Sequence, residues 1–381
     1  NLNLAIMIYK RFVVLMLGVI IFSPLLTAQV LTKTISRFDS LRNLTYKMTV
    51  KEKLPMTEEV SKDSLTANFA FSNSQELFNV VGQTTQEVYD GNKLVKIDLN
   101  SHTYSINKGI NGSMVQHRML PYIVNRLKLD LVKNVPIKME KDSVINDIKY
   151  FHLTITSRDT VMKGKRVFLI KKLLIDKKSY LPIYYKSEQQ GFVDGTDIFV
   201  DTYDESHFYD YDLERDNFSN ISEFKIPSDF VIKTLQKRKA SLIKGSEAPE
   251  LHLTDIAGNI FQLKRQKGKV VLLNFMTNSC FHSAEAISML NNLYSKYGKK
   301  NFSIVTINPY DNKEAIEIYN KKRNVKYPIY ISSGLHDLDS YHVYDFPTFY
   351  LVDKKRKVIQ ALGGYTDSTE KQLDNLIKQH L

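Results

Sequence analysis

The sequence predicts an α+β domain, an antiparallel curved sheet with few helices, followed by a second domain centred on a buried strand that leads into a helix. Two observations support this prediction. Short runs of strand-forming residues follow one another between residues 46 and 203, with turn signals between them, which is typical of an antiparallel meander with helices on its face. Farther on, the apolar, β-favouring run Val270–Phe275 precedes a helical pattern.

Composition agrees with two packed domains. The chain has 381 residues, a hydrophobic content of 43%, 22 tyrosines and 20 phenylalanines, which suits β-rich cores of ordinary size. The formal charge of +12 would suit a nucleic acid or an anionic surface, but lysines and arginines alternate with acidic residues along the chain. We therefore expect a solvated basic surface and no nucleic-acid partner.

The first 28 residues have the pattern of a secretory signal peptide. Met7 is a candidate start, Tyr9-Lys10-Arg11 supplies a short basic region, Phe12–Leu26 an apolar one, and cleavage is expected after Ala28. The apolar run is short for a membrane span, and an uncleaved anchor is the alternative. We expect a soluble protein that is periplasmic or secreted, in a bacterial cell envelope.

Residues 29–239 form the first predicted domain. Helices are expected over Val30–Leu44 and Met119–Leu127, where apolar residues recur at helical spacing. Asp90-Gly91-Asn92 predicts a hairpin, because glycine and asparagine tolerate positive φ. The predicted strands are Tyr46–Val50, Ala67–Phe71, Gln86–Tyr89, Lys93–Ile97, Thr103–Ile106, Tyr150–Thr156, Arg166–Asp176, Leu181–Lys186 and Thr196–Tyr203.

The order of these elements resembles the curved half-barrel of bacterial lipoprotein carriers, whose concave side holds acyl chains. The resemblance implies contact between the first domain and envelope lipids or lipoproteins. Ile226–Gly245 is the predicted link to the second domain, as a short helix or an extended tether. Its charged run Lys237-Arg238-Lys239 is expected to be a solvated face.

Cys280 lies where the strand pattern of Val270–Phe275 gives way to a helical one. At the start of a helix, unpaired backbone N–H groups and the positive end of the helix dipole favour a thiolate. Cys280 is the only cysteine of the chain, so no intramolecular disulfide can form. The lone thiol is either an inert buried group or a functional one.

The segment Gly245–Leu381 resembles the TlpA/ResA group of thioredoxin-fold redoxins, within the wider AhpC/TSA superfamily. The resemblance implies an α/β thioredoxin fold over residues 240–381, thiol-disulfide exchange without a cofactor, and Cys280 as the nucleophile. It also implies that Phe346-Pro347 forms a loop with a cis proline, which offers backbone groups to a bound chain. The matching stretches are Gly245–Pro249, Leu253–Asp255 with Gly258, Lys267–Phe275, Phe302–Ile307, Asn312–Lys322 and Tyr344–Asp353.

The sequence departs from the family pattern around Cys280. Ser283 replaces the second cysteine of the family's Cys-x-x-Cys pair, and Met276–Ser279 replaces its tryptophan-containing entry. Ser283 cannot resolve a mixed disulfide, and we expect it to cap the helix. His282 either adds positive charge near the thiol or is a polar residue at the helix start.

Three further residues are predicted to contact the substrate: Phe281, Phe346 and Thr277. In contrast, His336 and His342 are expected on loops and helix surfaces. We expect no metal site, because their spacing is not that of clustered ligands.

Three functions remain open. In the first, Cys280 forms mixed disulfides with exported client proteins, and an external thiol donor releases them. The second is a one-cysteine peroxidase, since Thr277 and Cys280 match the Thr-x-x-Cys of peroxiredoxins, although Leu273 stands where their proline is expected. The third is a non-catalytic redoxin-fold module joined to a lipid- or protein-binding β domain.

Overall fold

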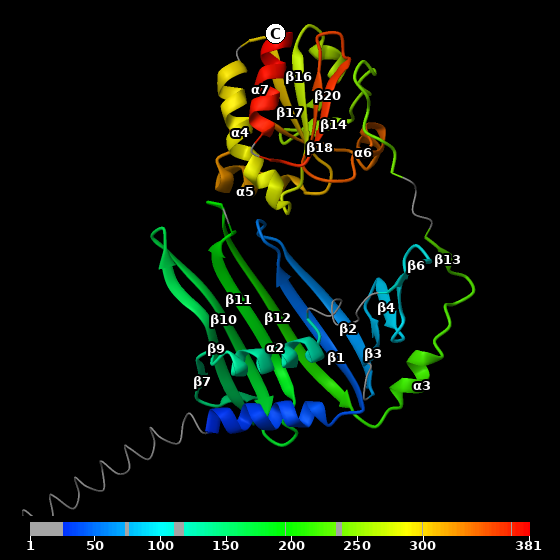
Figure 1. Ribbon diagram of the computed structural model, residues 1–381, viewed down its shortest axis with the longest axis vertical. Coiled ribbons are helices and arrows are strands. Elements are labelled where there is room, and N and C mark those ends of the chain that lie inside the picture. Colours follow the sequence, from blue (N-terminus) through cyan, green and yellow to red (C-terminus); the bar gives the residue numbers. More distant parts are fainter. Residues whose placement is uncertain are drawn as a thin grey trace, which may run out of the picture. The chain divides into compact units, whose positions relative to one another are not determined.

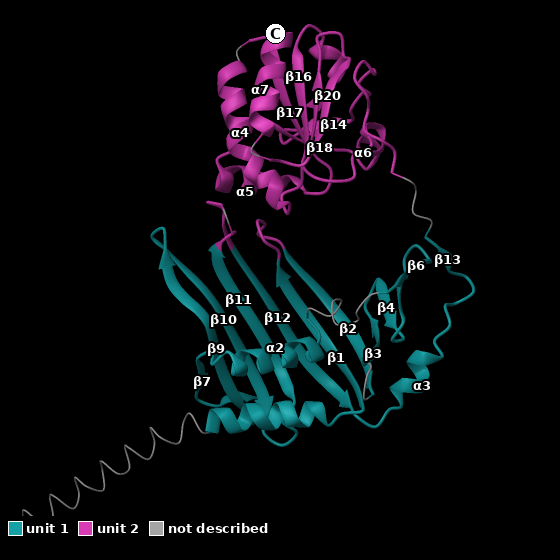
Figure 2. Cartoon of the chain, in the orientation of Figure 1, with its two compact units in different colours: residues 1–53, 60–191, 201–234 teal, residues 54–59, 192–200, 235–381 magenta. Residues whose placement is uncertain are grey.

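The computed structural model describes residues 26–72, 76–109, 118–194, 196–233, 238–298, 300–366 and 368–381. The chain divides into two compact units, which Figure 2 distinguishes by colour. Most of the predicted signal sequence lies in residues 1–25, outside the described residues. Over the described part, no helix is both long and apolar enough to cross a membrane. Unit 1 comprises Asn1–Lys53, Val60–Gly191 and Asp201–Thr234, and unit 2 comprises Leu54–Glu59, Phe192–Val200 and Leu235–Leu381.

Unit 1 is built on one long, mostly antiparallel sheet (Figure 1). Its strand order is β13-β6-β5-β4-β3-β2-β1-β12-β11-β10-β9-β7, and β8 pairs with β9 beside this path. Strand β13 pairs in parallel with β6. The bounds are β1 (Asn43–Lys53), β2 (Val60–Phe71), β3 (Glu76–Val81), β4 (Thr85–Tyr89), β5 (Lys93–Asp98), β6 (Thr103–Lys108), β7 (Ile137–Met139), β8 (Ser143–Ile145), β9 (Ile148–Met162), β10 (Lys165–Asp176), β11 (Pro182–Phe192), β12 (Phe199–Asp212) and β13 (Val231–Ile232).

All the strands predicted for this region overlap strands of the structure. The predicted hairpin is confirmed: β4 and β5 pair in antiparallel fashion around Gly91, which has a φ of 91°. The side chain of Asp90 holds the turn, because its Oδ1 accepts from the backbone N–H of Asn92 at 3.0 Å and of Lys93 at 2.9 Å.

The helices differ from the prediction at their ends. The first described helix covers residues 26–39, so it ends before Leu44, which lies in β1. Helix α2 (Leu120–Val132) begins where predicted, with Pro121 in its first turn, and continues farther. The short helix α3 (Asn217–Ser222) was not predicted.

Helix α2 and the helix at residues 26–39 lie across the strands of the sheet (Figure 1). Their apolar side chains share one core with aromatic residues of the sheet, among them Tyr46, Phe69 and Phe78, which are fully buried. Tyr46 also holds the start of α2, since its hydroxyl oxygen accepts from the Leu120 N–H at 3.1 Å. Lipid binding by unit 1, which the resemblance to lipoprotein carriers implies, stays a prediction.

A buried ion pair also ties α2 to the sheet. Lys171 Nζ on β10 lies 2.6 Å from Asp130 Oδ2 on α2, and the two side chains are only 5% and 7% exposed. A charge removed from water is costly unless it is paired. Removing either partner alone therefore leaves the other charge buried without compensation.

Unit 2 contains a seven-stranded mixed sheet of order β15-β14-β18-β17-β16-β19-β20. Strand β16 pairs in parallel with β17 and in antiparallel fashion with β19, and all its residues are buried. The strands are β14 (Leu253–Asp255), β15 (Ile260–Phe261), β16 (Val270–Phe275), β17 (Phe302–Asn308), β18 (Ile329–Ser332), β19 (Thr348–Val352) and β20 (Val358–Gly363).

Both faces of this sheet are covered. Helices α4 (Phe281–Tyr297), α5 (Lys313–Arg323) and α7 (Thr369–His380) share a core with Val270 and Leu272. The short helix α6 (His336–Tyr341) shares the other core with Val271 and Leu273. The alternation along β16 thus places successive side chains in opposite cores. The α/β thioredoxin fold predicted for this region is confirmed.

Candidate functional site

The fold places Cys280 at the junction of a strand and a helix. Strand β16 ends at Phe275, and α4 begins at Phe281. Cys280 is the N-cap residue of α4, with extended backbone (φ −84°, ψ 119°), and its side chain makes no capping hydrogen bond. The thiol is partly exposed. A half-buried thiol at a helix N-terminus is in a setting that favours nucleophilic chemistry.

The proline loop contacts the thiol directly. The Phe346–Pro347 peptide bond is cis, as predicted. Cys280 Sγ donates to the Phe346 carbonyl oxygen at 3.3 Å, so the cysteine and the loop are adjacent although they are far apart in the sequence. The Phe346 ring lies edge-on to Tyr310, with centroids 5.9 Å apart. Tyr310 is exposed, and an exposed aromatic side chain beside the Phe346 ring suits contact with an incoming chain.

Three residues after Cys280 lie in the first turn of α4. His282 Nδ1 is 2.7 Å from Glu285 Oε2 on the same helix, and its imidazole lies edge-on to the Phe281 ring, at 5.3 Å between centroids. Ser283 is 3% exposed, and its hydroxyl has no hydrogen-bond partner among the described residues. The helix already begins at Phe281, so the prediction that Ser283 caps it is wrong.

A buried polar network, which the sequence analysis did not find, supports the loop before Cys280. Asp311 Oδ2 accepts from the Asn278 backbone N–H at 2.9 Å, from Asn308 Nδ2 at 2.7 Å and from the Thr277 hydroxyl at 3.3 Å. Asn278 and Asn308 are fully buried, and their side chains bond to each other at 3.2 Å. The signal for this network was an Asn-Pro-x-Asp run at the end of a buried strand.

Tyr319 on α5 is a second buried polar group in this region. Its hydroxyl has no hydrogen-bond partner over the described part of the chain. Burial raises the pKa of Tyr319 well above its usual value; the Arg323 guanidinium opposes this shift, and the nearby acidic groups Cys280 and Asp311 add to it. The buried phenol therefore stays protonated.

Replacing Asp311 is expected to destabilise unit 2. Asp311→Ala leaves the Asn278 N–H and the Asn308 amide buried without their acceptor, which should lower the free energy of unfolding by about 2 kcal/mol. Urea denaturation followed by fluorescence measures the change. Asp339→Ala, at an exposed aspartate of α6, is the control and should stay within about 0.5 kcal/mol. Equal effects of the two substitutions would contradict the structural role of the network.

Comparison with known proteins gives a consistent result for this region. The AhpC/TSA family model matches residues 244–361. The thiol-disulfide oxidoreductase ResA of Bacillus thuringiensis subsp. konkukian is 34% identical over 135 residues, which cover 35% of this chain and 77% of that protein. ResA of Bacillus subtilis is 31% identical over 141 residues, covering 37% of this chain and 79% of that protein.

Solved structures also match. A putative thiol:disulfide interchange protein DsbE from Chlorobium tepidum aligns with a TM-score of 0.35 and 24% sequence identity, and the alignment covers 37% of this chain and 99% of that one. A putative protein disulfide isomerase from Bacteroides thetaiotaomicron aligns with a TM-score of 0.34 and 21% identity, covering 36% of this chain and 91% of that one.

Proposed function

We propose that this chain, which belongs to the ResA-like redoxins of the AhpC/TSA family, is an exported thiol-disulfide oxidoreductase that works with a single nucleophilic cysteine. The main support is the contact between Cys280 Sγ and the Phe346 carbonyl, 3.3 Å apart, beside the cis Pro347. In this function residues 240–381 carry the chemistry, and residues 29–239 contact client proteins or envelope components. The signal-peptide pattern of the first 28 residues supports export to the envelope.

The reaction needs no cofactor. The Cys280 thiolate attacks one sulfur of a client disulfide, the client S–S bond breaks, and the second client sulfur leaves as a thiolate that takes a proton from water. The product is a mixed disulfide between Cys280 and the client. An external thiolate, or another thiolate of the client, then attacks the client sulfur of this bond, and Cys280 leaves as a thiolate. Cys280 thus ends in the state in which it began.

The neighbouring residues have positioning roles in this proposal. The client segment lies along the Phe346–Pro347 loop by adding backbone hydrogen bonds, with Phe281 and Phe346 contacting its side chains. His282 carries positive charge near the helix start when it is protonated. The Thr277 hydroxyl is already bonded to Asp311 Oδ2 at 3.3 Å. This bond favours a structural role for Thr277 and supports disulfide exchange over peroxide reduction.

The serine at position 283 slows release of the client from the mixed disulfide. Without a second thiol in the first turn of α4, release of the client depends on a thiol from outside or from the client itself. A long-lived mixed disulfide suits isomerisation or retention of clients better than rapid reduction.

The test measures how fast Cys280 reacts with a disulfide in the folded chain. The reduced full chain, mixed with oxidised glutathione at neutral pH, should gain one reductant-sensitive glutathione by intact mass. Because Cys280 lies at a helix N-terminus in the folded chain, this reaction should be about tenfold faster than in the same chain unfolded in urea. Because Cys280 is the only cysteine, the adduct identifies its own site. A thiol that reacts only in urea would overturn the proposal.

A further inference from the structure

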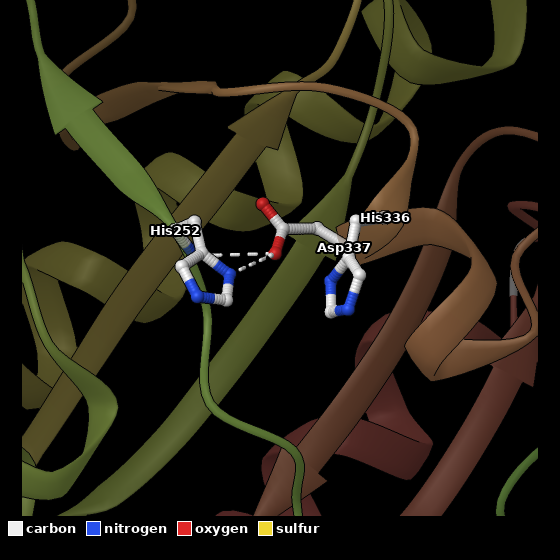
Figure 3. A group of neighbouring side chains, drawn as sticks. All are labelled: His252, His336 and Asp337. Atoms are coloured by element: carbon white, nitrogen blue, oxygen red, sulfur yellow. Dashed lines mark hydrogen bonds and ion pairs between the residues drawn. The ribbon is translucent and has the colours of Figure 1, made fainter.

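A second group of chemically active side chains lies in unit 2, on elements that the Cys280 site does not use. His252 immediately precedes β14, and His336 and Asp337 open α6. Each of the three offers one ligand atom, and these atoms all lie within 4.8 Å of one another. Figure 3 shows the two imidazole rings on either side of the Asp337 carboxylate. The spacing of His336 in the sequence indicates no cluster, because Asp337 and His252 are 85 residues apart along the chain.

Strand pairing in the sheet brings His252 close to His336 and Asp337. Strands β14 and β18 pair with Leu253 opposite Ser332, and the Ser333 N–H donates to the His252 carbonyl oxygen at 3.0 Å. His252 is thereby fixed beside the end of β18. The short turn from β18 into α6 then brings Asp337 close to His252.

The Asp337 carboxylate is held rigidly below the surface. Its side chain is 1% exposed. One oxygen, Oδ1, accepts from the His252 backbone N–H at 3.1 Å, and the other, Oδ2, accepts from the Ser332 hydroxyl at 2.7 Å. Within the described residues its one ion-pair partner is His252, whose Nδ1 lies 3.4 Å from Oδ1 and which is charged only when protonated. The structure therefore provides a fixed, buried carboxyl group that has no permanently charged partner among the described residues.

The side chains of the two histidines, in contrast, are exposed and have room to change rotamer. The His252 side chain is 60% exposed, and His336 is also exposed. Their rings lie 5.4 Å apart at 88°, and His336 Nδ1 is 3.4 Å from Ser340 Oγ. Ligand atoms around a tetrahedral ion with bonds of about 2.0–2.1 Å are roughly 3.4 Å apart. The ligand atoms here lie within 4.8 Å of one another, so ion binding requires the two exposed imidazoles to rotate toward the carboxylate.

We propose that His252, His336 and Asp337 bind a divalent cation of the zinc type. Two imidazole nitrogens and one carboxylate oxygen suit Zn²⁺, whereas Mg²⁺ and Ca²⁺ prefer ligand sets made of oxygen alone. Three protein ligands leave the fourth position of the ion to water. The ion also provides a permanent counter-charge for the buried Asp337 carboxylate. It links His252, which precedes β14, to the two ligands on α6.

The test is calorimetric titration of the untagged full chain with Zn²⁺, with Mg²⁺ as the comparison ion. It is carried out on Cys280→Ser, because a free thiolate is itself a zinc ligand. We expect one Zn²⁺ per chain and no measurable Mg²⁺ binding at the same site. His252→Ala and His336→Ala should each weaken zinc binding at least tenfold.

The control is His207→Ala, which removes an exposed histidine of β12 in unit 1. It should bind zinc as the parent does. Both cluster substitutions fall on exposed side chains, so the fold is expected to survive, and circular dichroism checks this. Any of three results would overturn the proposal. These are no zinc binding, a zinc affinity within threefold of the parent in either cluster variant, or a loss of affinity in His207→Ala equal to that in the cluster variants.

Discussion

Ser283→Cys is expected to shorten the lifetime of a mixed disulfide on Cys280 by roughly 100-fold at millimolar external thiol, because the attacking thiol becomes part of the same chain. Cys280 is the N-cap residue of α4, and Ser283 is the third residue of the helix. The side chain at each of these two positions can reach the backbone of the other, as in a capping box, so thiols at both positions would be close together. The new thiolate attacks Cys280 Sγ, the client leaves as a thiol, and a disulfide between positions 280 and 283 forms.

The substitution should not harm the fold. The Ser283 hydroxyl is buried and makes no hydrogen bond with any described residue, so the change to a thiol loses none. A thiol also tolerates an apolar environment better than an unpartnered hydroxyl does.

Quenched-time mass spectrometry of the glutathione adduct measures this lifetime. Ser288→Cys is the matched control, because residue 288 is exposed on the same helix and lies beyond the first turn. The control has the same number of thiols, but its new thiol is out of reach of Cys280. Equal lifetimes for the two variants would show that position 283 does not decide how clients are released.

The placement of Cys280 and Pro347 could be predicted because their signals are local or follow the family's spacing. Cys280 is recognisable from a buried strand that runs into a helix, and Pro347 from its place in the family pattern. The His282–Glu285 pair could also have been found, since residues three apart share a helix face. The Asn-Pro-x-Asp run marks the loop that holds Asp311, but the contact of Asp311 with Asn278 could not be predicted. That contact depends on the pairing of β16 with β17, which places the loops after both strands at the same edge.

Strand β3 shows the same limit in unit 1. A half-buried strand alternates apolar and polar residues, but here Leu77 and Phe78 are adjacent and both fully buried. They belong to different cores, on opposite faces of the sheet. The segment was not predicted as a strand, because covering both faces removes the alternation. The histidine cluster was missed for a related reason, since it forms only when β14 pairs with β18.

The second large effect is expected from the ion pair in unit 1. Lys171→Met should lower the free energy of unfolding by about 3–5 kcal/mol, because it leaves the Asp130 carboxylate buried without a counter-charge. Lys172→Met is the control on the next position of β10. The Lys172 side chain is 43% exposed, and its partner Glu188 also reaches solvent, so that change should cost less than about 1 kcal/mol. Urea denaturation of each variant provides the comparison.

The double variant Lys171→Met/Asp130→Leu shows whether Lys171→Met destabilises the protein through the lost ion pair or through lost packing of the Lys171 side chain. If the penalty of the single change comes from an uncompensated charge, removing that charge should restore most of the lost stability, since apolar replacements of a buried pair are often neutral or stabilising. If Lys171 acts mainly through its aliphatic stem, which fills space between α2 and β10, the second substitution should add its own penalty instead. A double variant less stable than Lys171→Met would therefore reject the electrostatic explanation. Recovery would mean that α2 docks on the sheet without the pair, and that the penalty of the single change comes from the uncompensated Asp130 charge.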